Sequence, residues 1–259
     1  MRIRSTARAL ILSGATFLCT LTSSVIAQQI GFKSSFENAL EGWRRELCCD
    51  YSAELVNYPV REGTQSLKIT LNRTDPDIHN SKRAELKLSP VPADSEYEYS
   101  FSIFLPHDYA HDQEREIVAQ WHSSPDFSLG ETRPGQPPLA LHTENGSWRL
   151  HRAWDEKPVT LRKQPQGKQA INLGRYDTGQ WTDWRVRVRW SHDSRGYIYI
   201  WKNKNLVWQH QGPSTYNDQL GPKFKIGIYK PGWKSRPQRS RVNQRVLYID
   251  RIEAVLQAP

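Results

Sequence analysis

The stretch that most constrains how this chain folds is residues 223–230, which read KFKIGIYK. Apolar and polar side chains alternate along it, and successive side chains of a β-strand point to opposite faces. We therefore expect a strand whose core face carries Phe224, Ile226 and Ile228. Its other face would carry Lys225, Gly227 and Tyr229. The same alternation is typical of an ordinary amphipathic strand and of one that presents a functional lysine and tyrosine.

Ten other short runs have strand character, and Gly, Pro, Asn or Asp turns separate them. They cover residues 65–71, 82–88, 96–105, 116–122, 139–144, 147–154, 184–191, 196–202, 205–209 and 245–256. Short strands at this spacing predict an all-β sandwich or jelly roll, with a meander over residues 184–209. Without an internal repeat or a low-complexity linker, residues 28–259 are expected to form a single domain.

Residues 1–27 have the pattern of a secretory signal peptide. Three arginines precede a largely apolar run over residues 9–21, and the small residues before Gln28 resemble a cleavage site. The apolar run is too short for a transmembrane helix. We therefore expect no membrane span and a mature chain that is secreted or periplasmic.

The mature chain remains basic. Removing the leader removes three arginines and no acid, so the formal charge falls from +9 to +6. A basic exported protein suggests an acidic partner, either nucleic acid, anionic lipid or anionic polysaccharide. No nucleic-acid-binding motif is present, so we expect no nucleic-acid partner. A solvated basic surface without a specific partner is the alternative.

Cys48 and Cys49 are the cysteines of the mature chain. Adjacent cysteines rarely bridge each other because the resulting ring is strained. No metal-type spacing is present. We therefore expect two free, buried thiols.

Two carboxylates near the ends of the mature chain, Glu37 and Asp250, are candidate ligands of a structural Ca²⁺. The first and last strands of a sandwich often lie together, and a carbonyl near Gly63 would add a further oxygen ligand. The alternative is that these carboxylates only accept hydrogen bonds.

Two segments are expected to form long loops. Residues 155–170 lack clear periodicity, and residues 231–244 carry four cationic side chains directly after the strand at 223–230. Such a charged loop is either simply solvated or lines a cleft for a polyanion.

Two further strands carry polar side chains on one face. Arg83, Glu85 and Lys87 alternate with apolar residues, and Gln120 and His122 flank Trp121. If these strands join the 223–230 strand in one sheet, their polar faces form a surface rich in donors and poor in carboxylates. Such a surface suits an anionic ligand.

These three strands resemble those of the jelly-roll polysaccharide lyases. The motifs are Arg83-Ala84-Glu85-Leu86, Gln120-Trp121-His122 and the 224–229 sequence FKIGIY. The wider sequence, with its tryptophan-rich region, is most similar to the heparin lyase I-like and glucuronan lyase group. The resemblance spans residues 32–256 and implies a concanavalin A-like jelly roll with a concave substrate cleft. Trp121 departs from the alginate lyase pattern, in which a smaller aliphatic residue is usual.

The resemblance implies cleavage of a uronate polymer by β-elimination, in which C5 loses a proton and the C4–O bond breaks. Arg83 and Gln120 suit stabilisation of the negative charge that builds on the carboxylate. Tyr229 would protonate the leaving oxygen, and either His122 or Tyr229 would remove the C5 proton. No cofactor is required for this chemistry.

The resemblance also suggests which residues bind neighbouring sugars. They are Lys225, Lys230, Trp233 and Arg236, with His142 and Glu85 as further candidates. A glucuronan-like polymer is the expected substrate, alginate and heparin-like chains are alternatives, and a monomer is expected.

Two other function classes remain open. A glycoside hydrolase needs two catalytic carboxylates, and the E-x-D-x-x-E strand of hydrolases with a similar fold is not found. A non-catalytic carbohydrate-binding module would keep the aromatic and basic residues but would not need His122 and Tyr229.

Overall fold

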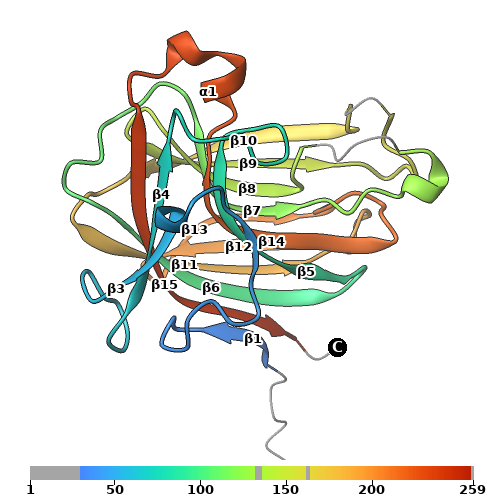
Figure 1. Ribbon diagram of the computed structural model, residues 1–259. Helices are drawn as coiled ribbons and strands as arrows, with labels where there is room; N and C mark the ends of the chain where they lie inside the picture. The colour runs from blue at the N-terminus through green and yellow to red at the C-terminus, as the bar shows by residue number, and fades with distance from the viewer. Residues whose placement is uncertain (1–29, 132–135, 162–163, 258–259) are drawn as a thin grey trace, which may run out of the picture.

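The computed structural model describes residues 30–131, 136–161 and 164–257. The predicted signal peptide lies outside them. Within this part of the chain, no helix is long and apolar enough to cross a membrane. The fold is all-β: the described residues form two antiparallel sheets, short 3₁₀ turns and one short α-helix, α1 (Gly232–Ser235). The prediction of an all-β jelly-roll sandwich is confirmed (Figure 1).

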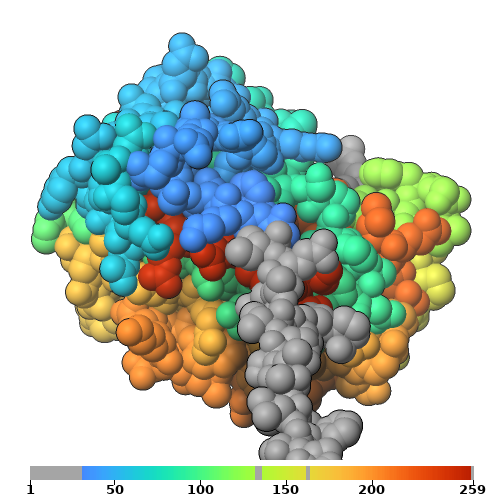
Figure 2. Space-filling model, turned by 90° about the horizontal axis from the view of Figure 1, so that it is seen from below, coloured from blue at the N-terminus to red at the C-terminus, as the bar shows by residue number. Residues whose placement is uncertain are grey.

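The first sheet has eight strands. Its hydrogen-bonded order is β13 (Asn205–Gln211), β12 (Tyr197–Lys202), β11 (Gln180–Arg189), β6 (Glu96–Leu105), β15 (Gln244–Leu256), β4 (Ser66–Asn72) and β3 (Ala53–Val56). The eighth strand, β1 (Ile30–Ser34), also pairs with β15. The N-terminal segment, blue in Figure 2, therefore lies against the red C-terminal strand. The expected meander is the β11–β12–β13 run.

The second sheet has seven strands and carries the candidate site. Its order is β10 (Gly167–Arg175), β9 (Ser147–Trp154), β8 (Leu139–Glu144), β7 (Glu116–His122), β14 (Leu220–Tyr229), β5 (Arg83–Pro92) and β2 (Arg44–Glu46). Strand β14 is thus placed between β7 and β5. Figure 1 shows β10, β9, β8, β7 and β14 stacked in this order.

The core lies between the two sheets and is rich in aromatic residues. Trp121, Phe224 and Tyr99 form ring contacts there, with centroids 5.2 to 5.3 Å apart. Phe224 and its apolar neighbours on β14 are at most 1% exposed. The predicted alternation along this strand is confirmed, because the same strand turns its polar residues away from the core.

Gly227 allows β14 to lie close to β5. Its φ is +138°, a conformation that other residues rarely adopt. A Cβ atom at this position would overlap the backbone carbonyl oxygen of Ala84 on β5. Only glycine therefore fits this place on the polar face, between Lys225 and Tyr229.

Four strands were not predicted. Strands β1, β2 and β3 are only three to five residues long. Strand β10 occupies the second part of the expected 155–170 loop and continues to Arg175. Most of its residues are exposed, because it lies at the edge of the sheet, and it therefore lacks the apolar alternation that marks a half-buried strand. The expected 231–244 loop contains α1 and a 3₁₀ turn, Pro237–Arg239.

Candidate active site

The strand register places the three motifs on one sheet face. Lys225 of β14 lies opposite Gln120 of β7, and Tyr229 of β14 lies opposite Arg83 of β5. Residues directly opposite each other point to the same face of a sheet. The prediction that these strands share a polar face is therefore confirmed.

Two carboxylates form the centre of this face. Glu46 of β2 lies opposite Glu85 of β5, and both are almost completely buried. Lys225 Nζ lies 2.6 Å from Glu46 Oε2 and 2.8 Å from Glu85 Oε2. Arg83 Nη1 lies 3.1 and 3.2 Å from the same two oxygens. Two cations therefore neutralise two carboxylates that would otherwise repel each other.

Ionisation of Glu46 depends on these cations. Burial by itself would raise its pKa, but Lys225 and Lys87 outweigh burial and lower the pKa to about 2. Lys87 Nζ donates to Glu46 Oε1 at 2.9 Å. Glu46 is therefore ionised near neutral pH, as its ion pairs require.

Gln120 completes this buried layer. Its Nε2 donates to Glu85 Oε1 at 2.5 Å, which fixes the orientation of the amide because a carboxylate only accepts. Gln120 is 0% exposed. The predicted contact between Gln120 and a substrate carboxylate is not available in this arrangement. We call Glu46, Glu85, Arg83, Lys225 and Gln120 the buried polar layer.

His122 is half-buried at one end of the layer. Its Nδ1 lies 3.0 Å from the carbonyl oxygen of Ser123, which can only accept, so Nδ1 carries a proton. Burial, with smaller contributions from Lys225 and Lys223, lowers the pKa of His122 to about 4. Near neutral pH the ring is therefore neutral, and Nε2 has a free lone pair.

Lys223 lies directly opposite His122 on β14. It is half-buried, and among the described residues its Nζ has neither an ion pair nor a hydrogen bond. Burial and the like charges of Lys87 and Lys225 lower its pKa. Lys223 was not among the predicted site residues, although it shares the alternation of Lys225 and Tyr229.

Tyr229 is at the opposite end of the layer from His122. Its ring is stacked on the Arg83 guanidinium, whose Cζ lies 4.2 Å from the ring centroid. Tyr229 lies six positions along β14 from Lys223, the partner of His122, which is roughly 20 Å of strand. The expectation that one sugar meets both His122 and Tyr229 is therefore not supported by the register.

Two of the predicted sugar-binding residues, Lys230 and Trp233, are buried away from the polar sheet face. Lys230 is 0% exposed, and its Nζ lies 2.7 Å from Asp112 Oδ2 and 2.9 Å from the Glu114 carbonyl oxygen. It follows Tyr229 directly, so the period of two turns it to the other face. Trp233 is 3% exposed, and its indole N–H donates to Ser240 at 2.7 Å. Both predictions are wrong, because neither side chain is accessible to a polymer.

The other predicted sugar contacts differ in exposure. Lys225 and Glu85 belong to the buried polar layer and are at most 3% exposed, so they support the site instead of touching a ligand. His142 is only 1% exposed, so its side chain cannot touch a polymer directly. Arg236 is accessible, but its Nη2 lies 2.6 Å from Glu114 Oε1. Much of the positive charge of the 231–244 segment is compensated in this way, because Lys234 also pairs with Asp77.

The two candidate calcium ligands accept hydrogen bonds from one segment of backbone. Glu37 Oε1 accepts from the N–H groups of Thr64 and Gln65 at 2.9 and 3.0 Å. Asp250 Oδ2 accepts from the N–H groups of Arg61 and Glu62 at 2.8 and 3.1 Å. N–H donors do not coordinate a cation, so this arrangement fits the hydrogen-bonding alternative. The calcium site at Glu37, Gly63 and Asp250 stays a prediction.

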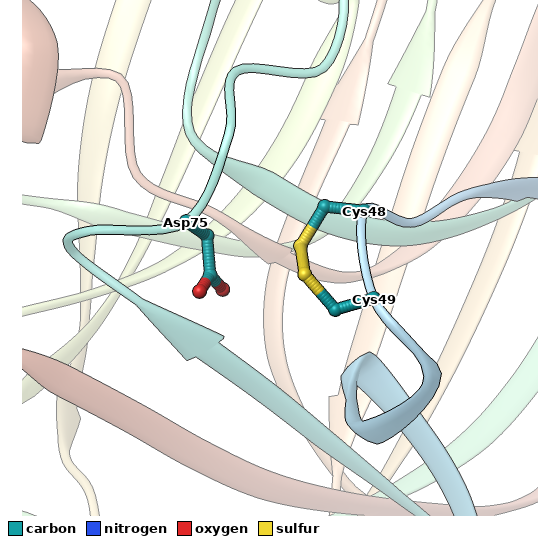
Figure 3. A group of neighbouring side chains, drawn as sticks. All are labelled: Cys48, Cys49 and Asp75. Carbon is teal, nitrogen blue, oxygen red and sulfur yellow. A yellow bond between two sulfur atoms is a disulfide. The ribbon is translucent and has the colours of Figure 1, made fainter.

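Cys48 and Cys49 form a disulfide with each other, so the prediction of free thiols is wrong (Figure 3). The turn after β2 brings the two sulfur atoms together, and both cysteines are only half-buried. The Asp75 carboxylate faces them in Figure 3 and accepts from the Tyr51 hydroxyl at 2.5 Å. The three groups lie within 4.8 Å of one another. Because the sulfurs are bonded to each other, they do not provide thiolate ligands for a metal.

Glu46 is the residue of the layer that sequence analysis missed. It lies on a strand of three residues, Arg44–Glu46, which is too short for an alternation to be recognised. Its only sequence signal is an acid two residues after Arg44. The ion pair with Lys225 joins positions 179 residues apart, and no local pattern predicts such a contact.

Replacing Lys225 by methionine should destabilise the protein strongly, because Glu46 and Glu85 would remain buried with one cation fewer. We expect a loss of about 3–5 kcal/mol in the free energy of unfolding, measured with urea. The control is Lys68→Met, which removes a half-exposed ion pair with Glu54 at 2.9 Å and should lose at most about 1 kcal/mol. Equal losses in the two variants would contradict the structural role of the layer.

Acid should destabilise the protein through three histidines. Burial lowers the pKa of His122 and His151 to about 4 and that of His142 well below 6.5. Between pH 6.5 and 4 these three histidines bind more protons in the unfolded chain than in the folded one, so their contribution to the free energy of unfolding should fall as pH falls through this window. Asp218, whose pKa burial raises to about 7, contributes with the opposite sign but is one group against three. Urea titrations at several pH values measure the slope, and His142→Gln should flatten it. A stability that is constant across the window would contradict the assignment.

Comparisons with known proteins agree with this fold. The solved structure of an endo-β-1,4-glucuronan lyase from the fungus Trichoderma reesei superposes with a TM-score of 0.74 at 19% identity, covering 88% of this chain and 96% of that one. An alginate lyase of polysaccharide lyase family 7, A1-II′, superposes with a TM-score of 0.60 at 13% identity, covering 88% and 100%. A cellulose-induced protein, Cip1, has a TM-score of 0.53 at 14% identity, covering 86% and 96%.

A sequence search of curated proteins found no significant match. The structural likenesses are all below 25% identity and show the fold alone. The family model described as polysaccharide lyase, however, matches residues 28–253, which is most of the sequence. The chain therefore belongs to the polysaccharide lyase family.

Proposed function

We propose that this polysaccharide lyase is an exported enzyme that cleaves a uronate polymer, glucuronan in the first place, by β-elimination. The observation that carries the proposal is the pair of accessible groups His122 and Lys223. A neutral imidazole with a free Nε2 lies directly opposite an ammonium group without an ion pair. The likeness to a glucuronan lyase structure supports the choice of polymer.

The reaction needs a base, an acid and positive charge near the substrate carboxylate. In β-elimination the C5 proton leaves, its electron pair forms a C4=C5 double bond, the C4–O bond breaks and the leaving oxygen takes a proton. We assign His122 Nε2 as the base, since the ring is neutral near pH 7.

The ammonium of Lys223 is assigned as the acid that protonates the leaving oxygen. A lowered pKa makes a lysine a better proton donor, and burial together with neighbouring cations lowers that of Lys223. Tyr229 was the acid that the sequence suggested, but the register places it about six residues along β14 from the partner of His122. We assign the ring of Tyr229 to a sugar further along the polymer.

Positive charge near the substrate carboxylate would come from Lys87, whose side chain is 25% exposed. Such fixed charges stabilise the anion that forms as C5 loses its proton. Lys87 does not need to change position during the reaction, because Glu46 already holds its ammonium in place. Glu46 and Glu85 hold Arg83 and Lys225 in the same way.

The rate should separate the two possible acids. Lys223→Met is expected to lose at least about two orders of magnitude in kcat, the usual scale for removing an acid–base group. Tyr229→Phe, which keeps the ring but removes the hydroxyl, should stay within about tenfold of the native kcat. Loss of activity in Tyr229→Phe with a normal rate in Lys223→Met would return the acid role to Tyr229.

The assay also tests the class of activity. Purified mature protein is incubated with polyglucuronate, alginate, heparin and a neutral β-glucan, and ultraviolet absorbance follows formation of the conjugated unsaturated uronate. We expect the signal with polyglucuronate and none with the neutral polymer. New reducing ends without absorbance would indicate hydrolysis, and binding without either product would indicate a carbohydrate-binding module; both results contradict the proposal.

A further inference from the structure

A second cationic site lies on the same sheet face, beyond the buried polar layer. It is a pocket of about 370 Å³ whose lining includes Arg115, His151 and Lys168, which lie before β7, on β9 and on β10. This volume falls in the usual range of ligand pockets. Among the residues that the structure describes, no carboxylate side chain lines it.

Its cations have no ion-pair partner. Among the described residues, neither Arg115 nor Lys168 lies within 4.0 Å of a carboxylate oxygen, whereas Arg149 on the same strand as His151 pairs with Glu144 at 3.2 Å. Arg115 is half-buried, and its Nε is buried without a hydrogen-bond partner. A guanidinium held partly out of water without a counter-ion is a ready site for an anion.

The neighbouring histidines add directed donors. Arg115 Nη1 lies 3.3 Å from His151 Nδ1, and a guanidinium can only donate, so Nδ1 accepts. Because burial and the charges of Arg115 and Arg149 lower the pKa of His151 to about 4, the neutral ring carries its proton on Nε2. The ring of His142 packs against that of His151, tilted by 37° with centroids 4.2 Å apart, and both nitrogens of His142 are buried without a hydrogen-bond partner. This contact and the Arg115 hydrogen bond hold the His151 ring, and its Nε2–H is left to bind a ligand.

The register relates this pocket to the catalytic groups. Gln120 of β7 lies opposite Ala140 of β8, which lies opposite His151 of β9, and Ala170 of β10 follows. Two strand spacings, roughly 10 Å, therefore separate His151 from Gln120. A polymer that crosses the strands over His122 would pass this pocket within a few sugars.

We propose that Arg115, His151 and Lys168 form a binding subsite for the carboxylate of a second uronate residue, remote from the bond that is cleaved. This inference rests on the proposed function, because it takes the ligand to be a polyuronate. It gives the enzyme a reason to prefer a polymer with a charge on successive sugars over a short or neutral chain.

Kinetics with polyglucuronate test the subsite. Arg115→Gln and Lys168→Gln should each raise KM roughly tenfold, the scale of one lost charge-assisted hydrogen bond, and leave kcat within about twofold. Arg189→Gln and Lys204→Gln are the matched controls, because both residues belong to the other sheet or its turns, and they should leave KM unchanged. Melting temperatures show whether each variant is folded. An unchanged KM in both Arg115→Gln and Lys168→Gln, or an equal rise in the controls, would overturn the inference.

Direct binding keeps this test separate from the proposed function. Isothermal titration with polyglucuronate and with its carboxyl-reduced form is run on the native protein and on Arg115→Gln. We expect the native protein to bind the charged polymer at least about tenfold more tightly than Arg115→Gln does, and the two proteins to bind the reduced polymer equally. If the native protein binds but does not cleave, the proposed function fails while the subsite stands. If the native protein and Arg115→Gln bind the charged polymer equally, the subsite fails whatever the activity.

Discussion

The contact on which the candidate site depends is the ion pair of Lys225 with Glu46 and Glu85. Burying an isolated charge is strongly unfavourable, and a buried pair persists only when its partners and hydrogen bonds are complete. Here Arg83 and Lys87 add cations, and Gln120 occupies a further oxygen of Glu85. The set links β2, β5, β14 and β7, so it fixes the relative positions of four strands on the face that would meet a substrate.

The buried polar layer divides the site into two parts with different tasks. Its own members are inaccessible and act as a rigid, charged support. The groups that a ligand can reach lie around it, with His122 and Lys223 at one end, Tyr229 at the other and the Arg115 pocket beyond β8. Substrate contact and structural support thus fall to different residues of the same strands, which explains why several charged motif residues are buried.

Much of the fold could be predicted from the sequence, because alternation along long strands such as β14 and β6 reflects burial on one face only. Two strands without that alternation were not predicted. Strand β2 is too short to alternate, and β10 lies at a sheet edge with most side chains exposed. Strand period predicted which polar side chains share a face within each strand, but the pairing of β5, β7 and β14 in one sheet comes from the structure.

Accessibility within that face was not predictable. Whether Lys225 meets solvent depends on Glu46, which approaches from a distant part of the sequence. The orientation of Lys230, by contrast, follows from the same period of two that places Tyr229, so its burial on the other face was predictable from the sequence. The disulfide of Cys48 and Cys49 is an exception to the rule that adjacent cysteines rarely bridge each other, because the tight turn brings their sulfur atoms together.

The balance of charge in the buried polar layer has a consequence for how such an enzyme evolves. A single change at Lys225, Glu46 or Glu85 leaves an uncompensated charge, so these positions can drift only through paired replacements. Arg115 and Lys168, which have no ion pair among the described residues, can be replaced singly without leaving a buried charge unpaired. New substrate specificities would therefore arise at the accessible residues around the buried polar layer, while the layer itself stays the same.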